Sequence, residues 1–179
     1  MSEGIELPEH EEHEHRHPLT VPVTVTIAII AVLGAIVTLL GHRAHTEEVV
    51  LQAKSSDQWA YYQAKNIRRH TDELFTDLTS VEATTDAAAL AKLRDKYSSE
   101  AARYKDEQKE IEDKAHEMES EVSIERNRAD RFDLAEVFLE IGLVVTSITL
   151  LSGKRFFWML GISLGIIGTV TAATGFLIH

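Results

Sequence analysis

The sequence contains no cysteine and has only three prolines and nine glycines, which are unevenly distributed. The absence of cysteine excludes disulfides, thiolate nucleophiles and thiolate metal sites. Residues 42–141 contain neither glycine nor proline and are rich in Ala, Glu, Lys, Arg and Gln. Because these residues favour helix and nothing breaks it, we expect helices much longer than those of an ordinary globular domain.

Charge is missing from two other stretches, residues 19–41 and residues 156–178. A helix needs roughly 20 apolar residues to cross the hydrocarbon core of a bilayer, and both stretches are long enough. A soluble chain of this size could hardly bury two helices that are apolar on every side. The first stretch also lacks the basic flank and cleavage site of a signal peptide. The sequence therefore predicts an integral membrane protein in contact with the lipid bilayer.

Residues 133–153 predict a further transmembrane helix between these two, although it carries Glu136 and Glu140. Glu140 lies roughly 9 Å beyond the start of the apolar stretch at 1.5 Å per residue. An ionised carboxylate at that depth is costly unless it is hydrated or paired. We expect this acidic face to point into a bundle or a wet cavity, where it can bind a cation or a proton. The alternative, which we favour, is that the start of this helix lies in a wetter region.

The charged residues 42–132 predict two long helices, 44–81 and 87–132, with a turn near residues 80–86. Thr85 or Asp86 can cap the second helix. The similar lengths favour an antiparallel hairpin. The predicted fold is all-α, with three transmembrane helices (19–41, 133–153 and 156–178) and a coiled-coil stalk between the first and second.

Small and apolar residues recur in steps of three and four along both stalk helices, which is typical of coiled coils. The first heptad stripe comprises Val50, Ala53, Asp57, Ala60, Ala64, Ile67, Thr71, Leu74, Leu78 and Val81. The second heptad stripe comprises Leu90, Leu93, Tyr97, Ala101, Tyr104, Gln108, Ile111, Ala115, Met118 and Val122. We expect the two stripes to face each other.

Trp59 and Tyr62 fall outside the first heptad stripe, which places both aromatic side chains on the outer side of the predicted hairpin. Either the helix is rotated so that they enter the hairpin core, or they contact another subunit. We favour the contact with another subunit and therefore a homo-oligomer.

The third predicted span carries a small-residue stripe that lets helix backbones approach closely. It comprises Gly161, Gly165, Gly168, Ala172 and Gly175. A similar stripe on the first span comprises Ala28, Ala31, Ala35 and Thr38. We expect the first and third spans to meet at these faces, within one chain or between chains.

The stretch SDQWAYYQAK, residues 56–65, resembles a bacterial family of small membrane proteins known only as a domain of unknown function. The acidic tail, the anchor and the membrane hairpin extend the resemblance over most of the chain. It implies a location in the bacterial inner membrane. It implies no activity, so no functional residue is transferred.

The turn between the second and third spans carries Lys154 and Arg155, which favours a cytoplasmic turn. The N-terminus is then cytoplasmic and the hairpin periplasmic. The hairpin side of the spans also carries four arginines, which favour the opposite orientation: Arg43, Arg126, Arg128 and Arg131. We give the short turn more weight because long loops follow the charge rule poorly.

Residues 1–18 form an acidic, histidine-rich tail that we expect to be disordered. Imidazoles at this density can bind Zn²⁺, Ni²⁺ or Cu²⁺ weakly. The alternative, which we favour, is a solvated tail without a specific ligand. The candidate metal ligands are His10, His13, His15 and His17.

No triad, phosphate loop or zinc box is visible, so we expect neither enzymatic activity nor a cofactor. The formal net charge of −11 argues against nucleic-acid binding. The expected function is an oligomeric scaffold or assembly module of the bacterial envelope. The main alternative is an oligomeric ion channel or ion-sensing assembly in which Glu140 faces the path. A sensor whose hairpins pair into a ligand-binding bundle is a third interpretation, weakened by the lack of a recognisable output domain.

Overall fold

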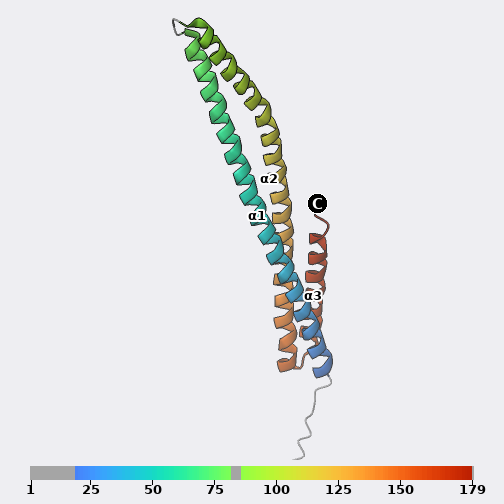
Figure 1. Cartoon of the computed structure of the whole chain (residues 1–179). Coiled ribbons are helices and arrows are strands. Elements are labelled where there is room, and N and C mark those ends of the chain that lie inside the picture. Colours follow the sequence, from blue (N-terminus) through green and yellow to red (C-terminus); the bar gives the residue numbers. More distant parts are fainter. Residues whose placement is uncertain (1–18, 82–85, 179) are drawn as a thin grey trace, which may run out of the picture. The chain divides into compact units, whose positions relative to one another are not determined.

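The computed structural model describes residues 19–81 and 86–178. All regular structure in these two ranges is helical: α1 is Thr20–Val81, α2 is Ala87–Ser152 and α3 is Arg155–Gly175 (Figure 1). Each of the three helices contains a stretch long and apolar enough to cross a membrane. The predicted all-α fold with three candidate spans is therefore confirmed.

Local chemistry marks where the helices begin and end. Asp86 accepts a hydrogen bond from the backbone N–H of Ala89 at 3.0 Å, which is the N-cap arrangement expected from the sequence. At the other end of α2, Gly153 has a φ of 65°, a left-handed conformation that glycine adopts without strain. Its N–H donates to the carbonyl oxygen of Thr149 at 2.8 Å. Between these two residues α2 is uninterrupted, as the lack of glycine and proline predicts up to residue 141.

The chain divides into two compact units. Among the described residues, unit 1 comprises residues 19–37 and Leu134–Ala172, and it holds most of the three candidate spans. Unit 2 comprises, of the described residues, 38–81, 86–133 and 173–178. It holds the charged segments of α1 and α2 together with the end of α3.

The core of unit 1 is narrow. Val23 of α1 and Leu139 and Thr146 of α2 are almost completely buried. The indole Nε1 of Trp158 in α3 donates to the hydroxyl of Thr26 in α1 at 3.0 Å. Most of the larger apolar side chains of these helices are exposed, which is compatible with a multi-pass membrane protein.

In unit 2 the second heptad stripe faces α1 over most of its length. Leu90 and Leu93 depart from this pattern, since the first is only half-buried and the second is exposed. The buried members are Ala101, Tyr104, Gln108, Ile111, Ala115 and Val122.

The first heptad stripe does not face α2, so this part of the predicted seam is wrong. Ile67 is 67% exposed and Leu74 is 60% exposed. The residues of α1 that are buried instead are Leu51, Ser55, Asp72 and Thr79. They lie one or two positions further along, which corresponds to a rotation of roughly 100–200° about the helix axis.

The physical reason for this rotation is a set of polar contacts between the two helices of unit 2. Lys65 pairs with Glu107 at 2.5 Å. The side-chain amide of Gln58 donates to the carbonyl oxygen of Ile111 at 3.3 Å. These partners are available only when the polar face of α1 is turned toward α2.

Candidate functional site

Trp59 lies against α2 in unit 2. Its indole Nε1–H donates to Oε1 of Glu119 at 2.8 Å. Its ring meets Tyr62 edge-on at 5.5 Å between centroids and His116 at 5.2 Å. Such edge-to-face pairs are favourable beyond the area that they bury. The predicted outer-side placement of Trp59 is wrong because α1 is rotated, whereas the predicted contact of Trp59 and Tyr62 with another subunit stays a prediction.

Glu119 holds this aromatic cluster in place. It accepts from Trp59, and His116 Nδ1 lies 3.1 Å from its other carboxylate oxygen. The hydrogen bond from Trp59, reinforced by that of His116, lowers the pKa of Glu119 because both contacts favour the charged carboxylate. The ionised carboxylate of Glu119 therefore helps to orient the indole of Trp59.

A second polar contact lies further along the same pair of helices. The hydrogen bond between Lys65 and Glu107 raises the pKa of the lysine and lowers the pKa of the glutamate. The same ammonium group lies 4.8 Å from the centroid of the Tyr104 ring, a cation–π distance. Gln108, next to Glu107, is buried, and its side-chain Nε2 has no hydrogen-bond partner among the described residues. The interior of unit 2 is thus held by polar side chains as much as by apolar ones.

The small-residue stripe of α3 is buried along its whole length. A Cβ added to Gly161 would collide with the Thr146 side chain, and one added to Gly168 would lie 2.8 Å from Cγ of Leu139. Both of these neighbours belong to α2. A Cβ on Gly165 would instead come within 3.3 Å of Ile30 in α1.

The main neighbour of this stripe is therefore α2, and α1 is reached at Gly165. The other two members are also buried: Ala172 is 7% exposed, and a Cβ on Gly175 would lie 3.1 Å from the Phe132 ring in unit 2.

The expectation that the stripe of the first span is a packing face is wrong within the chain. Its residues Ala28, Ala31 and Ala35 are exposed, because Val23 and Ile30 occupy the buried side of α1.

Glu140 is exposed on the α2 segment of unit 1. Its neighbours on that side, Val137, Ile141 and Val144, are also exposed. Glu136, one turn earlier, is half-buried. The prediction that this acidic face points into the bundle is wrong for Glu140 within one chain. The glycines of α3 pack against the opposite face of α2, which is formed by Ala135, Leu139, Gly142 and Thr146.

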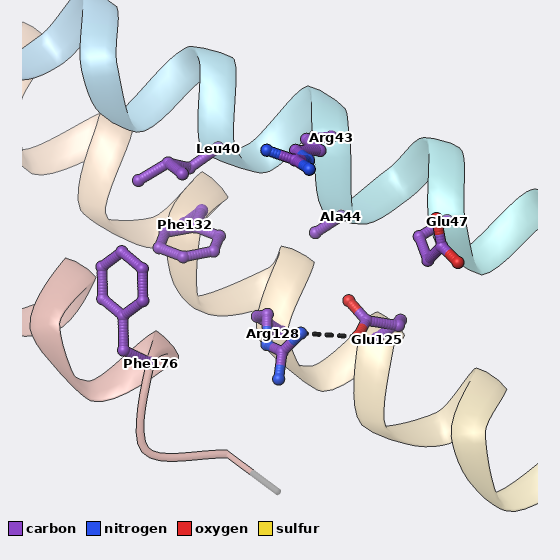
Figure 2. A pocket seen from close by; sticks show the side chains of 8 residues that line it. All are labelled: Leu40, Arg43, Ala44, Glu47, Glu125, Arg128, Phe132 and Phe176. Carbon is purple, nitrogen blue, oxygen red and sulfur yellow. Dashed lines mark hydrogen bonds and ion pairs between the residues drawn. The ribbon is translucent and has the colours of Figure 1, made fainter.

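A pocket of about 490 Å³ lies in unit 2 (Figure 2). Arg128 donates to Glu125 at 2.5 Å and to the carbonyl oxygen of Ile178 at 3.0 Å, which ties the end of the described chain to α2. The rings of Phe132 and Phe176 meet edge-on at 5.5 Å between centroids. The lining residues are Leu40, Arg43, Ala44, Glu47, Glu125, Arg128, Phe132 and Phe176.

This pocket combines an apolar wall with two guanidinium groups and two carboxylates. Because the two guanidinium groups balance the two carboxylates, the lining carries no net formal charge. Sequence reasoning missed the pocket. Arg43 and Arg128 were used only to argue orientation, although arginines beside an apolar run are also a signal for head-group contacts.

Within residues 19–81 and 86–178, no group of three or more His, Asp or Glu side chains is placed to hold a metal ion. The predicted ligands His10, His13, His15 and His17 lie outside the described residues.

No curated protein and no solved structure matches the chain. One family model covers residues 19–178, which include all three helices. The expected membership in an uncharacterised family is thereby confirmed, and the chain belongs to the family described as Domain of unknown function (DUF4337).

Proposed function

We propose that this chain is a non-enzymatic, homo-oligomeric scaffold or assembly module of the bacterial envelope, inserted in the inner membrane through all three helices. The observation that carries the proposal is the exposed position of Glu140 among apolar side chains. In a single chain this carboxylate would face lipid roughly 9 Å beyond the start of the span, where the cost is lower than the roughly 2.5–3.5 kcal/mol of a charged side chain at a helix centre. A second copy that covers this face removes the carboxylate from lipid and supplies polar partners.

In this proposal unit 2 forms an antiparallel hairpin outside the bilayer. Contacts along α1 run from Glu48 through Trp59 to Phe75, and their partners on α2 run back from Arg126 through Glu119 to Tyr97. At 1.5 Å per residue each arm extends roughly 65–70 Å. Such a length suits a role in holding partners at a distance from the membrane.

The orientation follows from the short turn after α2. Lys154 and Arg155 favour a cytoplasmic turn. The hairpin is then periplasmic, and the N-terminus is cytoplasmic.

The same carboxylate favours one alternative function, an oligomeric ion channel or ion-sensing assembly. A ring of Glu140 side chains from several copies would resemble the acidic rings that select cations in channels. The two functions differ in what surrounds Glu140, which is protein in the scaffold and water in the channel.

A spin label at position 140 separates these functions. Glu140→Cys introduces the only cysteine of the chain, so one site is labelled. The scaffold predicts low accessibility both to oxygen, which collects in lipid, and to a water-soluble nickel reagent. The ion path predicts high accessibility to the nickel reagent. Val170→Cys, exposed on α3, is the control for a lipid-facing side chain. Oxygen accessibility at position 140 equal to that control would contradict both functions.

A further inference from the structure

The first heptad stripe lies uncovered along α1 of unit 2. Its larger apolar side chains, Val50, Ile67, Leu74, Leu78 and Val81, are all exposed. These residues alternate in steps of three and four with smaller ones, although α2 packs against another face of the helix. Exposed apolar residues scattered singly need no explanation, whereas four large ones on one face of residues 67–81 indicate an interaction surface.

The spacing of the stripe specifies the kind of partner. Residues 50–81 extend for roughly 46 Å and more than four heptads, which exceeds the three to four heptads that indicate a coiled coil. Asp57 is the only charged member. The hydroxyl of Thr71 already donates to the carbonyl oxygen of Ile67 at 2.8 Å, so it needs no outside partner. A helix with the same period is the surface that can follow such a stripe along its length.

We propose that the first heptad stripe is the contact surface for a second copy of this chain, with two α1 helices parallel and in register. The inference deepens the proposed function and rests on it. Copies inserted in one membrane with one orientation hold equal residues at equal heights, so each layer of the stripe meets itself. Such a self-complementary contact is what two-fold symmetry requires.

The flanking residues are compatible with this register up to position 75. In a parallel pair of helices, a residue beside the stripe meets the residue five positions later in the other copy. Gln63 then meets Arg68, and His70 meets Phe75. Neither pair sets like charges against each other. By sequence, the last pair of the stripe, Asp77 with Glu82, does set two carboxylates against each other, so the register is compatible with the flanking residues only up to position 75.

Asp57 is the weakest layer of the proposed contact, since two carboxylates meet there. Polar residues at single core positions of coiled coils lower stability. Association should therefore rest on residues 60–81. Asp57→Leu should tighten it, raising the fraction of assembled protein upon dilution by several-fold.

Disulfide trapping tests the contact, because the natural chain has no cysteine to give background. Leu74→Cys is expressed in the full chain in two tagged lengths and oxidised in native membranes. Ser99→Cys is the control: it is exposed on α2, and it lies two residues from Tyr97, whose ring centroid is 4.4 Å from that of Phe75.

We expect a mixed-length disulfide product from Leu74→Cys and about tenfold less from Ser99→Cys, since a disulfide needs Cα atoms within roughly 7 Å. Ile67→Cys should repeat the Leu74 result, and unchanged helicity by circular dichroism shows that both variants fold. Equal yields from Leu74→Cys and Ser99→Cys, or no mixed-length product from either stripe variant, would overturn the inference. A native mass of several copies without stripe cross-links refutes only this surface, whereas a single copy refutes the proposed function as well.

Discussion

In unit 1 the backbones of α2 and α3 approach each other closely, whereas in unit 2 long side chains join α1 and α2. A Cβ on Gly142 would lie 3.1 Å from the carbonyl oxygen of Gly161. In unit 2 the helices are joined by ion pairs and by hydrogen bonds from aromatic side chains, such as that from the Trp59 indole N–H to Glu119. If unit 1 lies in the bilayer as proposed, apolar burial gives its helices no preference for each other over lipid, and tight van der Waals contact must hold them together. Unit 1 should therefore be sensitive to side-chain volume, and unit 2 to polar partners and pH.

The largest effect is expected from enlarging a glycine of unit 1. Gly161→Leu places a branched side chain where even a Cβ collides with Thr146, so it should lower the free energy of unfolding by about 3 kcal/mol. Thermal unfolding in a mild detergent measures this loss. Gly34→Leu is the matched control, because a Cβ at Gly34 meets nothing within 4 Å. Equal losses from the two variants would show that the close packing of α3 is not what stabilises unit 1.

A smaller loss is expected when the aromatic cluster of unit 2 is removed. Trp59→Ala deletes the hydrogen bond to Glu119 and two edge-to-face contacts, which should cost about 1–2 kcal/mol. Thermal loss of helicity by circular dichroism should move to lower temperature. If thermal stability stays unchanged while the number of copies falls, Trp59 faces another subunit and the rotation of α1 is wrong.

Trp59→Phe isolates the hydrogen bond from the ring contacts. The pKa of Glu119 should rise toward its usual value, because the first cause of its depression is the indole N–H. A carboxylate with a depressed pKa stabilises the fold above its unfolded pKa, and this contribution disappears as pH falls through the folded value. An NMR titration of the Glu119 side-chain carbon measures the change, and an unaltered pKa would show that the indole is not bonded to it.

The smallest effect is expected at His45. Its hydrogen bond to Asp133, with Nε2 and Oδ2 3.0 Å apart, is the main cause of a raised pKa, to which Glu48 adds. Stabilisation from protonated His45 is therefore fully present below pH 6.5 and is lost as pH rises through the folded pKa. Both side chains of the pair are about half exposed, so the contribution is about 0.5 kcal/mol or less.

His45→Gln should remove this pH dependence of the unfolding temperature between about pH 6 and pH 8. A variant that keeps the same dependence as the natural chain would assign it to another group.

The sequence contained enough information to predict the features that depend on local chemistry. The lack of breakers in residues 42–141 predicted the long charged segments of α1 and α2. Thr85 and Asp86 were the two candidate caps of α2, and Asp86 accepts the capping hydrogen bond. The small-residue stripe was recognisable because glycines such as Gly161 and Gly168 recur with helical spacing.

The rotation of α1 was not predictable in the same way. Both the apolar face that includes Ile67 and the polar face that includes Asp72 have heptad spacing. Heptad spacing indicates that either face can pack against a helix, but it does not specify which face packs against α2. That choice depends on long-range contacts such as the ion pair of Lys65 with Glu107. The exposure of Glu140 likewise depends on which face of α2 the glycines of α3 cover, a choice that no local pattern fixes.

The number of copies in the assembly tests the scaffold proposal most directly. Native mass spectrometry of the full chain, released from nanodiscs made of its own membrane lipids, measures this number. We predict a mass equal to two or more chains, and a lower number of copies for Leu74→Glu, which places a charge in the first heptad stripe. A mass equal to one chain, unchanged by Leu74→Glu, would contradict the proposal.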